Sequence, residues 1–174
     1  MEEKVILSAL ANNHPGVLLR ITGLFNRRGF NIESLTACTT EDPKTSRMTI
    51  AMTGDRSQIR QVMCQLMKLE DVKKVSLLTK EDASHSELLL VKIRVDNGQR
   101  SDALHIAYRH GARILDISHH TITIEATGQS GQIDELIQNL QKYPVVEMAR
   151  TGITALERGD GSISDHDGTS RPGA

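Results

Sequence analysis

Apolar residues in the first part of the chain follow two different spacings. Residues 4–11 are apolar and β-branched enough to predict a strand, which a turn of Asn, His, Pro and Gly ends. Apolar residues then recur three or four positions apart, which places them on one face of a helix: Val17, Leu18, Ile21, Leu24 and Phe25. Pro15 suits the first turn of this helix, and Gly29 suits its end.

Two more strands, a second helix and a fourth strand complete this half. Residues 30–40 and 46–54 predict a pair of strands, and the short loop 41–45 between them is typical of a hairpin. Asp55 then caps a helix with an apolar stripe of Ile59, Val62, Met63, Leu66 and Met67. With a strand at 71–79, the predicted order is βαββαβ.

The second half repeats this order with different residues. Strands are predicted at 87–95, 112–118, 120–128 and 145–156. One helix is predicted at 99–111, and the other carries the stripe Ile133, Leu136, Ile137 and Leu140. Equivalent elements of the two halves lie about 80 residues apart in the sequence. The halves share little sequence identity, so the repeat is one of structure.

We therefore predict an α+β protein of two tandem ferredoxin-like units, each with a four-stranded antiparallel sheet and two helices on one face. Residues 1–79 form the first unit, polar residues 80–86 a linker, and residues 87–158 the second unit. Residues 159–174 contain Ile163 as their one large apolar side chain, which predicts a disordered tail.

Charge and composition exclude several classes of function. The 174 residues include 21 basic and 22 acidic side chains, so nothing indicates a surface for nucleic acid or for a charged membrane. Only two Phe, two Tyr and no Trp are present, too few for the base-stacking platform of an RNA-recognition sheet. No apolar run approaches the roughly 20 residues of a spanning helix, and the acidic N-terminus is unlike a signal peptide. We expect a cytoplasmic protein.

The usual catalytic patterns are also missing. Cys38 and Cys64 lie in periodic segments and are predicted to be small buried thiols in a reducing compartment. No phosphate-binding glycine loop or activated nucleophile is visible, which predicts a non-catalytic chain. Two pairs of histidines are spaced wrongly for a shared metal, namely His105 with His110 and His119 with His120.

The turn before the first helix has the groups that a small zwitterion needs. Gly16 lies where the free N–H groups of the helix begin, and such a terminus favours a carboxylate. The amides of Asn13 and Asn31 can accept from an ammonium group and donate to a carboxylate. The alternative is that Asn12 or Asn13 merely caps the helix and that Asn31 shapes a turn.

Four segments carry a family resemblance. They are HPGVLLRITGLFNRRGFNIESLT at 14–36, SRMTI at 46–50, QLMKLEDVKKV at 65–75 and VEMARTGITALERG at 146–159. With them the chain resembles, over about residues 4–160, the regulatory (small) subunits of acetolactate synthase, also called acetohydroxyacid synthase.

The resemblance implies an N-terminal ACT domain, a C-terminal ferredoxin-like domain, and a homodimer through side-by-side ACT sheets. It also implies docking on a catalytic (large) subunit that carries thiamine diphosphate, magnesium and FAD, none of which this chain would hold. The implied role is to activate that subunit and to confer feedback inhibition by valine, or another branched-chain amino acid, in branched-chain amino-acid biosynthesis.

The resemblance further implies an effector site at the ACT dimer interface. It assigns to this site the asparagines Asn13 and Asn31 and the glycine Gly16. The backbone groups of Val17 and Leu18 would complete the cradle for the carboxylate, and Ile32 would form an apolar wall. The turn reads His14-Pro15 here, where many relatives have acidic residues or serine. The alternative function is a stand-alone ACT-domain sensor that regulates another enzyme or a transcription factor. A small ferredoxin-like enzyme would need a titratable cluster that the sequence does not show.

Overall fold

The computed structural model describes residues 3–79 and 82–165 and divides the chain into two compact units. The first unit contains the residues up to 84 and returns with the residues from 153 onward, whereas the second contains residues 85–152. These boundaries differ from the predicted ones. The start of a strand lies within the predicted linker 80–86, and residues 153–158 of the predicted second unit belong to the first compact unit.

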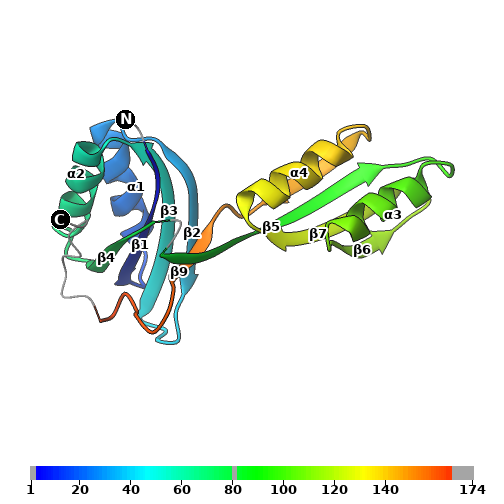
Figure 1. Ribbon diagram of the computed structural model, residues 1–174. Helices are drawn as coiled ribbons and strands as arrows, with labels where there is room; N and C mark the ends of the chain where they lie inside the picture. The colour runs from blue at the N-terminus through cyan, green and yellow to red at the C-terminus, as the bar shows by residue number, and fades with distance from the viewer. Residues whose placement is uncertain (1–2, 80–81, 166–174) are drawn as a thin grey trace. The chain divides into compact units, whose positions relative to one another are not determined.

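The first unit is a four-stranded antiparallel sheet of order β2-β3-β1-β4 with two helices on one face (Figure 1). Its elements are β1 (Glu3–Asn12), α1 (Val17–Arg28), β2 (Ile32–Thr39), β3 (Thr45–Gly54), α2 (Arg56–Leu66) and β4 (Val72–Leu78). The predicted βαββαβ order is confirmed, and β2 and β4 are the two edge strands.

Local sequence signals fix the start of α2 and the end of α1. Asp55 accepts a hydrogen bond from the backbone N–H of Gln58, whose side chain accepts one from the backbone of Asp55 in return, so the predicted cap of α2 is confirmed. Gly29 ends α1 in the left-handed conformation, at φ 69°. The inward faces of the helices bury Ile21 and Val62 against the sheet.

The prediction that both thiols are buried is wrong, because Cys38 and Cys64 are exposed. Cys38 lies on β2, at the edge of the sheet, and Cys64 lies on α2 outside the buried stripe that contains Val62 and Leu66. A periodic segment therefore does not by itself bury a small side chain.

The other face of the first sheet is covered by chain that arrives from two distant places. Ala83 at the start of β5 (Ala83–Arg94), together with Ile153 and Ala155, buries Ile6 and Leu78. Ala155 belongs to β9 (Thr154–Glu157), which pairs with β5, and both segments lie on the face away from α1 and α2 in Figure 1. This sheet is therefore covered on both faces.

The single strand predicted at 145–156 is two strands in the structure. β8 (Val145–Arg150) belongs to the second unit and β9 to the first, and Gly152 between them has φ 76°. A positive φ turns the chain away from the extended conformation at little cost only for glycine. Gly152 within the predicted strand is the one local signal of this break, because an isolated glycine in a strand pattern marks a bulge or a bend.

The residues after β9 continue to pack on the first unit. Ile163 is only 4% exposed, and the Lys74 ammonium group on β4 donates a hydrogen bond to the carbonyl of Ser164. The predicted disorder is therefore wrong for residues 159–165, because the first unit supplies a partner for the one large apolar side chain. Residues 166–174 of the predicted tail lie outside the described part of the chain.

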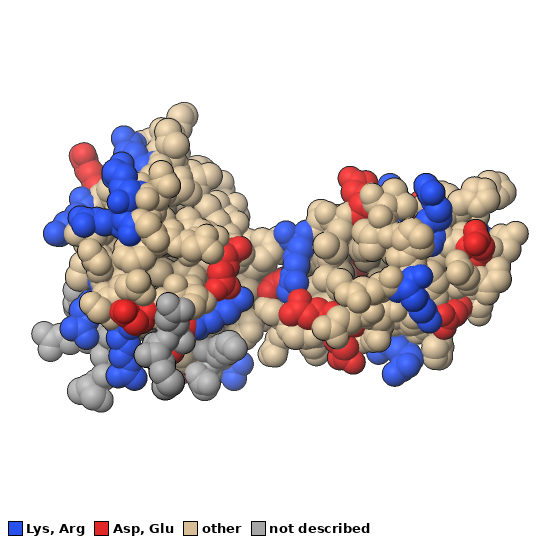
Figure 2. Space-filling view, turned by 90° about the horizontal axis from the view of Figure 1, so that it is seen from above, with Lys and Arg blue, Asp and Glu red and all other residues tan. Residues whose placement is uncertain are grey.

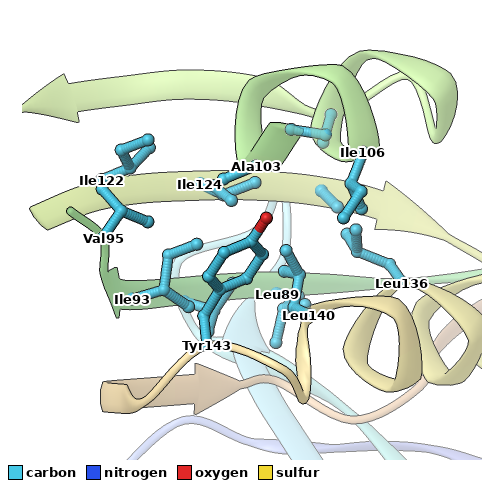
Figure 3. Close-up of a cluster of buried hydrophobic side chains, with 14 of the residues drawn as sticks. Leu89, Ile93, Val95, Ala103, Ile106, Ile122, Ile124, Leu136, Leu140 and Tyr143 are labelled. Atoms are coloured by element: carbon cyan, nitrogen blue, oxygen red, sulfur yellow. The ribbon is translucent and has the colours of Figure 1, made fainter. Parts of the chain in front are cut away.

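The second unit has a four-stranded antiparallel path of order β6-β7-β5-β8. Besides β5 and β8, its elements are α3 (Arg100–Arg109), β6 (Arg113–Ile117), β7 (Thr121–Gly128) and α4 (Ser130–Leu140). Figure 3 shows the ring of Tyr143 among Ile93, Leu89 and Leu140, and its hydroxyl donates to Asp102 Oδ2 at 2.5 Å. This bond satisfies the one polar atom that the ring brings into the core.

A buried ion pair holds β5, β8 and α4 together. The carboxylate of Glu87, whose side chain is 4% exposed, accepts from Arg150 Nε and from the hydroxyl of Ser130 at the start of α4. Arg150 also donates to Asp134 Oδ1 at 2.7 Å. A buried charge needs such partners, so losing either side of the Glu87–Arg150 pair would leave the other uncompensated.

Acidic and basic side chains are mixed on the surface of each unit, as Figure 2 shows for one face. The longest helix in the described residues, α1, has 12 residues, and none of the described helices is long and apolar enough to cross a membrane. Within the same residues, no three His, Cys, Asp or Glu side chains gather as they would around a metal ion.

Replacing Ile163 with alanine should lower the free energy of unfolding of the first unit by about 2 kcal/mol, because a buried isoleucine leaves a cavity there. Urea unfolding of the full chain would measure this change. Leu156→Ala is the control, since Leu156 on neighbouring β9 is 55% exposed and its loss should change stability little. Equal stability of Ile163→Ala and the parent chain would show that residues 159–165 do not pack on the unit in solution.

Candidate functional site

The connection between β1 and α1 leaves the first turn of the helix open. Gly16 is the N-terminal cap residue at φ 92°, and in the described structure no side chain caps the helix. The expectation that Asn12 or Asn13 caps α1 is therefore wrong. The N–H groups of the first turn lack a carbonyl four residues earlier in the helix, so a carboxylate in front of Gly16 would find donors and the positive end of the helix dipole.

Gly16 is required for its backbone conformation. A Cβ built at Gly16 would meet no described atom within 4 Å, so space is available on this side of the turn. The φ of 92° is one that residues with a Cβ rarely adopt. Glycine therefore allows the sharp turn and leaves the approach to the helix terminus open.

Asn13 is bound to the far end of β2. Its Nδ2 donates to the carbonyl of Pro43 at 2.8 Å and to Thr39 Oγ1 at 3.3 Å, and its backbone N–H donates to the carbonyl of Lys44 at 2.8 Å. Since the NH₂ group donates to the loop, the amide oxygen is the atom suited to accept from an ammonium group.

Asp42 organises the loop that receives Asn13. Its carboxylate accepts from Thr45 Oγ1 at 2.7 Å and from the backbone N–H of Lys44 at 3.0 Å. The hydrogen bond from Thr45, followed by the one from Lys44, lowers the pKa of Asp42 below its usual value. The loop geometry is therefore stabilised by the ionised carboxylate and is lost as pH falls through that lowered pKa.

Val17 and Leu18 lie beside the turn with opposite exposure. Val17 is 2% exposed, so its side chain belongs to the core, and its backbone N–H already donates to the carbonyl of His14 at 3.4 Å. Leu18 is 44% exposed and leaves an apolar side chain at the surface of the first helical turn.

Asn31 and Ile32 lie at the opposite end of α1. The helix has 12 residues, so its two ends are separated by roughly 18 Å. The strand register agrees, because Ile32 pairs with Met52 whereas Asn12 pairs with Thr45 at the other end of β3. One copy of the chain therefore brings Asn13, Gly16, Val17 and Leu18 together but leaves Asn31 and Ile32 apart from them.

Sequence reasoning missed two residues that position the turn. Thr39 receives Asn13 across 26 positions of the sequence, and Asp71 binds the turn across 57. Thr39 lies outside the quoted family segments, and the segment that contains Asp71 does not link it to the turn, because each residue acts through a contact that only the folded chain creates.

The first unit has the architecture of an ACT domain, with four antiparallel strands in βαββαβ order and two helices on one face. Residues 7–74 match the AHAS small subunit-like ACT domain, and residues 86–159 match the small subunit of acetolactate synthase. The chain belongs to the acetolactate synthase small-subunit family.

Curated relatives are similar to this chain over nearly its whole length. The chain is 41% identical over 157 residues to the probable acetolactate synthase small subunit of Archaeoglobus fulgidus, covering 90% of this chain and 98% of that protein. It is 39% identical over 156 residues to the acetolactate synthase isozyme 3 small subunit of Escherichia coli, covering 89% and 96%. A crystal structure of the acetolactate synthase small subunit of Thermotoga maritima is similar with a TM-score of 0.86 at 34% identity, covering 91% of this chain and 99% of that one.

Replacing Gly16 with alanine should cost about 1 to 2 kcal/mol of unfolding free energy, because the left-handed backbone strains a residue with a Cβ. Gly23→Ala in the interior of the same helix is the control. It should instead stabilise the chain by up to about 1 kcal/mol, since alanine is the better helix former and its Cβ meets only ordinary contacts. Chemical denaturation of both variants tests the pair, and a gain in stability for Gly16→Ala would rule out the left-handed turn.

Proposed function

We propose that this chain is the regulatory subunit of an acetolactate synthase in branched-chain amino-acid biosynthesis, activating a catalytic subunit and making it sensitive to valine. The names of the relatives, each a small subunit, support a larger catalytic partner. In this proposal thiamine diphosphate, magnesium and FAD belong to that partner, this chain is not catalytic and carries no cofactor, and both work in the cytoplasm.

The observation that carries the effector site is the position of two amides at opposite ends of one edge strand. Asn13 is bonded to Thr39, the last residue of β2, and Asn31 immediately precedes its first residue, Ile32. β2 lies at the edge of the sheet, so a second copy can pair with it. Antiparallel pairing of two β2 strands about a two-fold axis would place the start of each beside the end of the other.

In the proposed homodimer, each effector site is completed across the interface. Asn13 and the open helix terminus at Gly16 come from one copy, and Asn31 and Ile32 from the other. The helix terminus would take the carboxylate of valine, the two amides would hold its charged groups, and Ile32 with Leu18 would contact its side chain. Two identical sites would follow from the symmetry.

Inhibition then requires no contact between valine and the catalytic centre. If valine binds the dimer more tightly in a low-activity assembly, it shifts the population toward that assembly by its differential affinity. Couplings of this kind are typically about 1 to 3 kcal/mol, and the catalytic subunit must change the affinity for valine by the same factor.

The first test mixes the chain with its cognate large subunit and follows acetolactate formation from pyruvate, with and without valine. The parent chain should stimulate the large subunit, and valine should reverse the stimulation. Asn13→Ala should keep the stimulation and raise the half-inhibitory valine concentration at least about tenfold, because a hydrogen bond to a charged group is lost.

The control for that assay is Asn139→Ala, an asparagine on α4 of the second unit, which should keep both stimulation and valine sensitivity. Loss of stimulation and inhibition together in Asn13→Ala would indicate damage to the fold. A parent chain that binds valine without stimulating the large subunit would instead identify a stand-alone amino-acid sensor.

A second test asks whether each site draws on two copies. Asn13→Ala and Asn31→Ala chains with different affinity tags are coexpressed, and the heterodimer is purified through both tags. One of its sites would lack both amides and the other would be intact, so calorimetry should find one site of parental affinity in each dimer.

Each homodimer of a single variant should contain no site of parental affinity, and the parent dimer should contain two. A heterodimer that binds valine no better than either homodimer would place the site within one copy or elsewhere on the chain.

A further inference from the structure

The start of β2 contains one residue more than the strand beside it. Ile32 pairs with Met52 on β3, and Ser34 pairs with the adjacent residue, Ala51, so Glu33 is left without a partner in the ladder. Such a β-bulge re-aims the neighbouring side chains, because the alternation of the strand is broken at one position. The bulge directly follows Asn31 and Ile32, which one copy would contribute to the effector site of the other.

The bulge decides on which face of the sheet Ile32 lies. In a regular strand Ile32 and Leu35, three positions apart, would point to opposite faces. With the bulge, both pack against the buried cluster under α1 and α2. Their partners on β3, Met52 and Ile50, belong to the same cluster. Ile32 therefore lies on the face of the sheet that carries the helices.

The effector of the proposed dimer would lie on that same face. A two-fold axis that pairs two β2 strands antiparallel in one sheet runs perpendicular to the sheet, so the helices of both copies share one face. The helix terminus at Gly16 is on this face, since α1 begins there. The bulge thus turns Ile32 toward the side on which the helix terminus of the second copy would hold the effector.

Glu33 ties the bulge to the two strands beyond it. The hydroxyl of Thr53 on β3 donates to Glu33 Oε1, and Lys4 Nζ on β1 lies 2.7 Å from Glu33 Oε2. Lys4 and Thr53 are partners in the β1–β3 ladder, so one carboxylate joins three adjacent strands. The hydrogen bond from Lys4, followed by the one from Thr53, lowers the pKa of Glu33 below its usual value, so the carboxylate is ionised at neutral pH.

The chain on the other side of Asn31 is fixed as well. At the end of α1, the N–H of Gly29 donates to the carbonyl of Asn26 at 3.1 Å. The N–H of Phe30 donates to the carbonyl of Phe25 at 3.0 Å. The side chain of Asn31 is exposed and makes no hydrogen bond within the residues that the structure describes. Its position is therefore set by the helix end before it and by the bulge after it.

We propose that Glu33 is a positioning residue of the effector site, whose bonds to β1 and β3 hold the bulge that presents Asn31 and Ile32 to the second copy. This inference rests on the proposed function and adds to the site a residue that need not touch the effector. Without the carboxylate the bulge is free to shift, and Asn31 and Ile32 leave the positions in which they meet the effector. The fold persists, because an ion pair between partly exposed side chains contributes little to stability.

Calorimetric titration of valine into the full chain measures this effect. Glu33→Gln should weaken valine binding about fivefold, within the range of coupling that residues in contact show. Lys4→Gln should weaken it by a similar factor, because it removes the other side of the ion pair. The double variant should also bind about fivefold more weakly, and not about twenty-five-fold, since both changes break the same contact. The charge swap of Lys4→Glu with Glu33→Lys should bind valine more tightly than Glu33→Lys alone.

Glu147→Gln is the matched control, because Glu147 forms an exposed ion pair with Lys92 at 3.8 Å between two strands of the second unit. This variant should keep the parental affinity for valine. Two readouts need no effector. Glu33→Gln should have the same mass as the parent chain in light scattering, and it should stimulate the cognate large subunit to the same extent.

Parental valine affinity in Glu33→Gln would overturn the positioning role and leave the effector site in place. Additive losses in the double variant would overturn it too, because Lys4 and Glu33 would then act separately. A lower mass of Glu33→Gln in light scattering would also overturn it, by showing that Glu33 acts on the assembly of the copies. Failure of the parent chain itself to bind valine would instead reject the proposed effector site, and the role of Glu33 with it.

Discussion

The left-handed backbone at Gly16 sets where α1 begins, and with it the position of the helix terminus that one copy contributes to the candidate effector site. It turns the chain from β1 into α1 without a capping side chain, so no side chain occupies the N–H groups of the first helical turn. Two long-range contacts add to the local ones that hold the turn. Asn13 fixes it to the hairpin loop between β2 and β3, and Asp71 fixes it to the loop between α2 and β4, so its position depends on two distant segments of the chain.

Other parts of the chain cover both faces of the first unit's sheet, whereas a ferredoxin-like fold requires helices on only one face. Helices cover one face, and the start of β5 with β9 covers part of the other, where Ile6 and Ala51 are buried. The residues that complete this unit follow the second unit in the sequence. The first unit is therefore finished only after the second has been synthesised, and residues 1–79 alone would expose apolar surface on that face.

The proposed regulation acts on the equilibrium between assemblies of high and low activity. In the proposed function, an effector that joins two copies at their edge strands would change the stability of one assembly relative to another, and a remote catalytic centre would respond because it prefers one of them.

The sequence by itself determined the features that depend on neighbours three or four positions away. The βαββαβ order of both halves follows from apolar periodicity, and the cap at Asp55 and the stop at Gly29 follow from local chemistry. The family motifs also identified the turn around Gly16.

Tertiary structure decided which distant segments meet. It exposed Cys38, buried Ile163, and divided the last predicted strand between two units. It also gave Asn13 a partner in Thr39 instead of the helix terminus and placed Asn31 at the far end of α1. Burial and side-chain pairing depend on what the rest of the chain brings to a surface, and that information is absent from any short window of sequence.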